Sequence, residues 1–113
     1  QRLARKICQK CKTVDKPNPL MLKALGLTKT KKYYKGKGCE QCLNTGYSGR
    51  LVISELLTVS DDMRKAIEED KKEMEITSLA KKNGFKPFIF DAGEKIKAGI
   101  TSVEEVCRVL KIQ

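Results

Sequence analysis

Apolar residues in the second half of the chain recur at spacings of three and four, and glycine, proline or small polar residues separate the runs. Side chains at these spacings share one face of a helix, so the pattern predicts four short helices that form a compact lobe. The first begins after Ser60, the second spans about residues 74–83, the third begins near Pro87, and the fourth begins in the segment 101–105. The residues expected on their buried faces are Met63, Ala66, Ile67, Ile76, Leu79, Ala80, Phe88, Ala92, Ile96, Val103, Val106, Cys107 and Leu110.

Hydroxyl residues at the starts of two of these helices predict how the helix ends are capped. Ser60 precedes two aspartates, whose carboxylates favour the positive end of the helix dipole. Thr101 with Glu104, and Ser102 with Glu105, both fit the capping box. In that motif a hydroxyl and a carboxylate each accept a hydrogen bond from an amide that the helix leaves without a partner.

The first half of the chain contains two shorter helical patterns. Leu3 and Ile7 lie four positions apart, so the first seven residues are expected to be the end of a helix. Asn18 directly precedes Pro19, which is a favourable N-cap followed by a favourable first helical residue. A short helix is therefore predicted from this point to Gly26, a natural C-cap.

Two stretches rich in β-branched and aromatic residues predict strands, at residues 31–35 and 50–59. With the helices, they predict an α+β fold that is mainly helical. We expect a small subdomain with short strands over residues 1–50, followed by a helical subdomain over residues 51–113. Units of this size have marginal cores, so the first one is expected to need a metal or another cross-link.

Four of the five cysteines form a pattern typical of a metal site. They are arranged as two C-x2-C pairs with 27 residues between the pairs: Cys8, Cys11, Cys39 and Cys42. A two-residue spacer lets one tight turn present two sulfurs on the same side, and two such turns complete a tetrahedral shell around Zn²⁺. The long gap indicates that a small folded insert separates the two turns.

Two other uses of these cysteines are less consistent with the sequence. Nothing indicates secretion, where disulfides would persist, and a thioredoxin-like redox site uses one C-x2-C pair at the start of a helix. With four thiolates and no open position, the zinc would be structural, and the thiolates would leave a net charge of −2 on the site. Nearby lysines would offset that charge: Lys6, Lys10, Lys12, Lys35 and Lys37.

The excess positive charge lies in the front third of the chain. Residues 1–37 hold twelve Lys or Arg and one acidic residue, whereas the remainder holds twelve Lys or Arg and thirteen acidic residues. Such a surface could meet nucleic acid, anionic lipid or an acidic protein, or it could simply be solvated. A nucleic-acid-binding zinc module is the alternative function, with Tyr33 and Tyr34 as stacking platforms.

Other features are absent from the sequence. No apolar run approaches the length of a membrane span, and no signal peptide is recognisable, so the chain is expected to be cytoplasmic. There is no G-x4-G-K-[ST] phosphate-binding loop, and there is no histidine to pair with a serine or cysteine nucleophile. The chain is therefore not expected to be an enzyme by itself. The fifth cysteine, Cys107, falls on a helical apolar face and receives no functional role.

Several segments together resemble the type II secretion and type IV pilus assembly ATPases. These are QRLARKIC-x2-C, GCEQCLNTGYSGR, ISELL and AGITSVEEVCRVL, in the same order as in that family. The resemblance implies that the four paired cysteines are zinc ligands and that Gln1, Arg2, Leu3 and Arg5 belong to a helix leaving the catalytic core. It also implies that Gly49, Arg50 and Glu55 match the family's G-R-x4-E segment.

The same resemblance implies a role for the longer protein. It would be a cytoplasmic homohexameric motor on the inner face of the inner membrane, in peripheral contact with acidic lipid and with an inner-membrane platform protein. The boxes that bind ATP and Mg²⁺ would lie upstream of the segment matching Gln1. The present chain is then expected to be the non-catalytic, zinc-binding C-terminal region that stabilises the motor and docks it.

Overall fold

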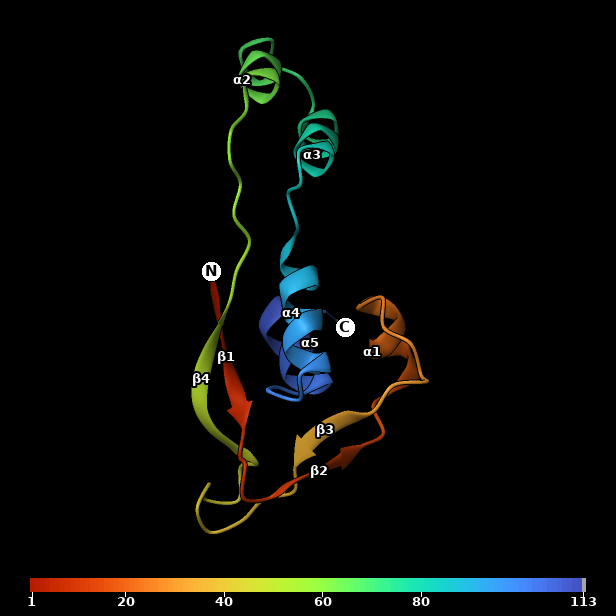
Figure 1. Ribbon diagram of the computed structural model, residues 1–113, viewed down its shortest axis with the longest axis vertical. Helices are drawn as coiled ribbons and strands as arrows, with labels where there is room; N and C mark the ends of the chain where they lie inside the picture. Colours follow the sequence, from red (N-terminus) through yellow and green to blue (C-terminus); the bar gives the residue numbers. More distant parts are fainter. Residues whose placement is uncertain (113) are drawn as a thin grey trace. The chain divides into compact units, whose positions relative to one another are not determined.

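A computed structural model describes residues 1–112, which fold as two compact units (Figure 1). The first unit combines residues 1–54 with the segment from Phe88 onward, and the second comprises residues 55–87. The boundary that the sequence placed after Arg50 therefore falls inside a strand of the first unit. The last two helices belong to the first unit because they pack on its strands. Within residues 1–112, no helix combines the length and apolarity needed to cross a bilayer.

Two short antiparallel sheets form the strand part of the first unit. Strand β1 (Arg2–Ile7) pairs with β4 (Tyr47–Ile53), and β2 (Lys12–Asp15) pairs with β3 (Tyr33–Gly36). Helix α1 (Pro19–Ala24) lies between β2 and β3 in the sequence. The described residues thus contain five helices and four strands. The α+β class is confirmed, but its mainly helical character is not.

The helix expected over the first seven residues is wrong, because this segment is strand β1. Ala4 and Ile7 are its buried residues, and Leu3 is 56% exposed opposite Val52 of β4. Strict alternation along β1 is broken because the register with β4 shifts between Arg5 and Ile7. Over that interval β4 has one residue more than β1, which is the signature of a β-bulge.

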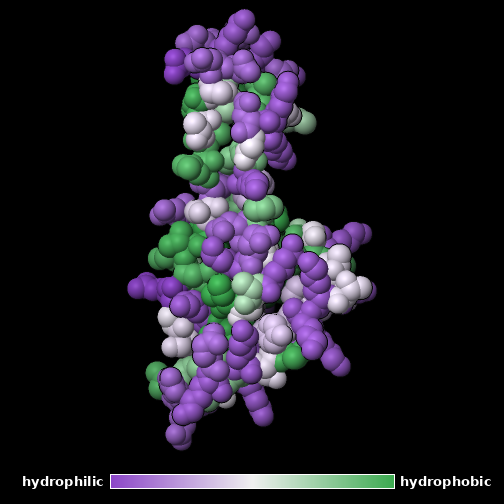
Figure 2. Space-filling model, viewed as in Figure 1, coloured by the Kyte–Doolittle hydropathy of each residue, from purple (hydrophilic) through white to green (hydrophobic). Residues whose placement is uncertain are grey.

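The core of the first unit lies between the strands and the two C-terminal helices. Helices α4 (Phe88–Lys97) and α5 (Val103–Leu110) supply much of it, as their apolar spacing predicted. The buried cluster comprises Ala4, Leu22, Leu25, Tyr33, Ile53, Ala92, Ile96, Val103, Val106 and Cys107, with Phe88 and Leu110 packed against it. Figure 2 also shows exposed apolar surface on the side of β1 and β4, where Leu3 and Val52 are cross-strand partners.

Three helix starts are capped by the predicted residues. Asn18, Ser60 and Ser102 each accept a hydrogen bond from an amide in the first turn of α1, α2 or α5. The capping boxes, however, are not completed as expected. The Glu105 carboxylate bonds to two arginines, and the Thr101 hydroxyl donates to the Arg5 carbonyl at 2.9 Å.

The second unit is a pair of helices, α2 (Asp61–Glu68) and α3 (Glu73–Lys82). Met63, Ala66 and Ala80 are buried as predicted, but Ile67 is 49% exposed. The strand expected over residues 50–59 ends at Ile53. Residues 54–59 lie outside β4 and are exposed.

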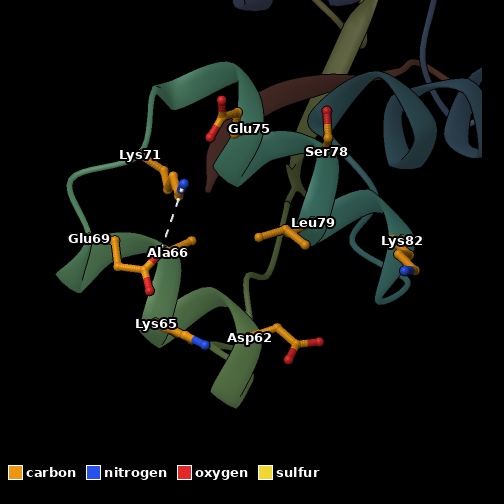
Figure 3. A pocket seen from close by; sticks show the side chains of 9 residues that line it. All are labelled: Asp62, Lys65, Ala66, Glu69, Lys71, Glu75, Ser78, Leu79 and Lys82. Atoms are coloured by element: carbon orange, nitrogen blue, oxygen red, sulfur yellow. Dashed lines mark ion pairs between the residues drawn. The ribbon is translucent and has the colours of Figure 1, made fainter.

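A pocket of about 580 Å³ lies between α2 and α3 (Figure 3). Ala66 and Leu79 provide its apolar side chains, and the remaining lining is mostly charged. Lysines and acidic residues alternate around it, with one ion pair at 3.9 Å between Lys71 and Glu69. The pocket therefore lacks both a cluster of one charge and a nucleophile with a paired base.

Candidate metal centre

The strand pairing explains how two cysteine pairs that are far apart in the sequence meet. The first knuckle, residues 8–11, joins β1 to β2, and the second knuckle, residues 39–42, lies between β3 and β4. In each sheet, one strand adjoins the first knuckle and the other strand adjoins the second knuckle, because β1 pairs with β4 and β2 pairs with β3. Both ends of each knuckle are thereby fixed opposite the other knuckle.

The four sulfurs of Cys8, Cys11, Cys39 and Cys42 all lie within 4.8 Å of one another. The Cys8–Cys39 and Cys11–Cys42 sulfur separations are 3.8 Å, and the Cys39–Cys42 separation is 3.6 Å. Ideal tetrahedral Zn²⁺ with bonds of about 2.3 Å places its sulfurs about 3.8 Å apart. The same separations are far too long for a disulfide, whose S–S bond is about 2.05 Å. The sulfur geometry therefore fits one tetrahedral metal ion.

Backbone amides point at two of the sulfurs. The Gly38 amide donates to Cys11 Sγ at 3.3 Å, and the amides of Cys39 and Gly46 each donate to Cys42 Sγ at 3.2 Å. Amides directed at a sulfur stabilise its thiolate form and fix the direction of its lone pairs. Residues in and beside the second knuckle thus supply hydrogen bonds to the sulfurs of Cys11 and Cys42.

The thiol pKa values differ across the cluster. The hydrogen bond from Gly38 lowers the pKa of Cys11, but burial and hydrogen bonds with the other three thiols outweigh it and raise the pKa to about 11. Burial raises the pKa of Cys42, but hydrogen bonds from the Cys39 and Gly46 amides and from neighbouring thiols lower it to about 6. The two amides directed at Cys42 Sγ therefore favour the thiolate form of this ligand candidate.

The two chain segments that flank the second knuckle approach so closely at Gly36 and Gly46 that neither position has room for a side chain. A Cβ added at Gly46 would lie 2.5 Å from the Gly36 carbonyl oxygen, and one at Gly36 would overlap the Gly46 backbone. Gly46 also has φ +83°, which favours glycine. Its carbonyl accepts from the Cys8 amide at 2.9 Å, linking the second knuckle directly to the first.

The lysines expected to offset the charge of the site have varied surroundings. Lys6, Lys10 and Lys37 are exposed. Lys35 forms an ion pair of 3.9 Å with Asp15, and the Lys12 ammonium lies 4.8 Å from the centre of an aromatic ring. Two of the five therefore have other contacts. Cys107 is buried in α5 and lies outside the group of four sulfurs, as its helical position predicted.

A second polar cluster, which the sequence did not reveal, lies along β1. Its members, called the Glu105 cluster below, are Arg5, Tyr47, Ser102, Glu105 and Arg108. Glu105 is 1% exposed and accepts from the side chains of both arginines. Burial raises the pKa of Glu105, but these hydrogen bonds and the Arg5 amide lower it to about 2. The E-x-x-R spacing could have signalled the Arg108 pair, but no local pattern could have signalled Arg5.

Comparison with known proteins places these features in a family. The model of the family described as "Type II/IV secretion system protein" matches residues 1–108. The chain is 44% identical over 110 residues to a "Type IV pilus assembly ATPase PilB" of Thermus thermophilus. It is 37% identical over 112 residues to a "Type II secretion system protein E" of Pectobacterium carotovorum.

These alignments cover nearly the whole chain but only a small part of each relative. They span 94% and 98% of the chain, but 12% of the Thermus protein and 22% of the Pectobacterium protein. The match to the family model and the identities extend from the cysteine knuckles to the C-terminal helices. The chain belongs to the type II/IV secretion system protein family.

Proposed function

We propose that Cys8, Cys11, Cys39 and Cys42 hold one structural Zn²⁺. The proposal rests on one observation: four sulfurs from two knuckles converge at separations expected of a tetrahedral zinc site. A metal bound there would cross-link the segments on either side of the 27-residue insert. The four thiolates fill the coordination shell, so the site would stabilise the fold and not carry out catalysis.

Metal analysis of the purified, reduced chain tests this proposal. We expect one zinc per chain, and Co²⁺ substitution should give the absorption spectrum of a tetrahedral four-sulfur site. The Cys39→Ser variant should lose most of the bound metal, whereas Cys107→Ser should retain it. Absence of stoichiometric metal from the wild-type chain would refute the proposed site.

The chain would be the non-catalytic C-terminal zinc region of an ATPase for type IV pilus assembly or type II secretion. The names of the relatives support this role, and the chain corresponds to only part of their length. The complete protein would be a cytoplasmic homohexamer that binds ATP and Mg²⁺ elsewhere and lies at the inner membrane. In that setting this region would stabilise the motor and dock it to an inner-membrane platform protein.

The basic front segment is proposed as the docking surface, with acidic lipid as a peripheral contact. Lys29, Lys31 and Lys32 are all exposed in the loop before β3. Exposed cations at this density attract anionic surfaces in a salt-dependent way. The nucleic-acid alternative is less well supported, because Tyr33 is only 2% exposed and its hydroxyl bonds to the Thr28 carbonyl. Tyr33 is therefore not available for stacking on a base.

Vesicle binding tests the docking surface. The double variant Lys31→Glu, Lys32→Glu should bind acidic vesicles several-fold more weakly than the wild type while keeping its metal. The matched control Lys81→Glu, Lys82→Glu makes the same charge change at exposed positions of α3 and should bind as the wild type does. Equal binding by the two variants would exclude this surface.

A further inference from the structure

Strand β1 has a second edge, and residues 100–105 occupy it. The Arg5 amide donates to Glu105 Oε2 at 2.7 Å, and the Arg5 carbonyl accepts from the Thr101 hydroxyl at 2.9 Å. Two residues along, the Ile7 amide donates to the Ile100 carbonyl at 2.9 Å. A two-stranded sheet would leave these groups of β1 facing solvent, whereas here each has a protein partner. The path of β1 up to Cys8 is therefore fixed on both edges.

Glu105 is the charged residue among those that cover this edge of β1. Its carboxylate is fully buried and accepts from Arg5 Nε at 3.2 Å, Arg5 Nη2 at 3.1 Å, Arg108 Nε at 2.7 Å and Arg108 Nη2 at 2.8 Å. Together with the Arg5 amide, five N–H contacts direct the carboxylate toward one position on β1. Paired, bidentate contacts of this kind give a defined geometry as well as attraction. Helix α5 is thus joined to β1 three residues before Cys8.

A second connection runs from the same helix to the other knuckle. The Tyr47 hydroxyl bonds to Ser102 Oγ at 2.6 Å, and the Arg5 guanidinium lies 4.2 Å from the centre of the Tyr47 ring. Tyr47 directly follows Gly46, whose amide donates to Cys42 Sγ and whose carbonyl accepts from the Cys8 amide. The Glu105 cluster therefore contacts both strands that lead into the four-sulfur site.

We propose that Glu105 is a positioning residue for the metal centre, acting through Arg5 and β1 to set the place of Cys8 relative to the second knuckle. The inference rests on the proposed metal site and adds a residue that lies outside the cysteine motif. Residues outside the coordination shell that orient ligands commonly change metal affinity by 10- to 100-fold when altered. Glu105 would do so from a helix that begins 64 residues after Cys39 in the chain.

The chain offers a chemically matched control at the other end of β4. The Asp91 carboxylate accepts from the Ser54 amide at 2.9 Å and from Lys95 Nζ at 3.0 Å. Like Glu105, it joins a helix to a strand backbone and pairs with a cation on its own helix. Ser54 follows the end of β4 that points away from the cysteines in the sequence, so Asp91 should not position a sulfur. Val106→Ala provides a further control, because Val106 is buried in α5 without polar contacts to β1.

The experiment measures zinc affinity by competition with a chromophoric chelator, on the 113-residue chain and its Glu105→Gln, Asp91→Asn and Val106→Ala variants. Thermal stability of each zinc-loaded variant is recorded, because any loss of folding also lowers metal affinity. We expect Glu105→Gln to weaken zinc binding by about tenfold or more, and by more than Val106→Ala at equal loss of stability. Asp91→Asn should leave the affinity unchanged. Equal affinities in Glu105→Gln and the stability-matched control would overturn the inference.

Two further measurements keep the test decisive. If Glu105→Gln does not fold, Glu105→Asp retains the charge, and its side chain, which is one methylene group shorter, should lose the contact with the Arg5 amide. Its affinity should also fall, and wild-type affinity in Glu105→Asp would overturn the inference. Amide exchange at Ile7 and Cys8 in the zinc-loaded chain should accelerate in the Glu105 variants only. If the wild type itself binds no zinc, the proposed metal site fails first, which is a distinct result.

Discussion

The two compact units differ in the range of the contacts that hold them together. In the first unit, Cys8 meets Cys39 and Arg5 meets Glu105, so residues 31 and 100 positions apart are brought into contact. The second unit is a helical pair in which α2 packs on α3, the next element in the sequence. Contacts between distant residues require the closure of long loops, which costs conformational entropy. The comparison indicates that a cross-link between distant segments would stabilise the first unit more than the second.

Metal removal should have the largest effect, and it should act mainly on the first unit. Zinc binding contributes about 10–16 kcal/mol in small finger peptides, which is comparable with the whole stability of a domain. Chelation should therefore unfold the knuckles and strongly reduce the amide protection of β1, β4 and α5. Helices α2 and α3 should change much less. Hydrogen exchange measured by mass spectrometry checks this, and equal loss of protection in both units would contradict the comparison.

Loss of the Glu105 charge should have the next largest effect. Because the folded-state pKa of about 2 lies below the unfolded value of about 4.3, ionised Glu105 stabilises the fold by about 3 kcal/mol at neutral pH. That stabilisation is present above about pH 4.3 and is lost as the pH falls through about 2. Glu105→Gln should therefore lower the free energy of unfolding at pH 7 by a similar amount.

Denaturant unfolding at a series of pH values measures this difference, with both chains compared at the same metal content. The difference in free energy of unfolding between wild type and Glu105→Gln should become smaller as the pH falls below about 4. The neighbouring Glu104 is exposed, so Glu104→Gln should change stability by less than about 0.5 kcal/mol. If this difference in free energy of unfolding does not change with pH, the charge of Glu105 does not stabilise the fold.

The close approach of Gly36 and Gly46 predicts a smaller but specific effect. Gly46→Ala should cost about 2 kcal/mol or more, because it combines a positive φ with a Cβ placed 2.5 Å from the Gly36 carbonyl. Gly26→Ala is the matched control, since Gly26 also has a positive φ but no atom within 4 Å of the added Cβ. It should cost about 1 kcal/mol from backbone strain alone. Thermal unfolding of the zinc-loaded variants should rank them in this order, and equal costs would argue against steric contact.

The smallest effect is expected from a cap in the second unit. Ser60 Oγ accepts from the Met63 amide at 3.3 Å at the start of α2. Ser60→Ala should therefore reduce the stability of α2 by about 1 kcal/mol. Zinc affinity should remain that of the wild type, because the change is confined to the helical pair. Reduced metal binding in this variant would show that the two units are energetically coupled.

Local patterns were sufficient to predict the cysteine group and most helix starts. The C-x2-C spacing identified the four sulfurs that the structure brings together, and Asn18, Ser60 and Ser102 cap the helices expected of them. Each C-x2-C pair and each helix cap depends on residues within three or four positions of one another. Their physical causes are therefore visible in a short window of sequence.

Features that depend on distant partners were misinterpreted. Leu3 and Ile7 have helical spacing, but β1 is a strand because it pairs with β4, more than 40 residues away. The bulge in that pairing also hides the alternation that would have indicated a strand. Glu105 was interpreted as a helix cap because its partner Arg5 lies 100 positions away. In each case a contact absent from the local window determined the conformation.

The segment between Ile7 and Tyr47 carries the four cysteines, and its two ends are held together by the pairing of β1 with β4. This pairing affects where the segment could change in length. Ile7 and Tyr47, the residues at the two ends of this segment, are cross-strand partners. Residues added between Asp15 and Tyr33 would extend a loop whose two ends are already held together by β2 and β3. Doubling such a loop costs only about 0.6 kcal/mol of closure entropy. Insertions should therefore be tolerated in the exposed loop over residues 29–32, and not within α1, whose Leu22 lies in the core, or next to the sulfurs.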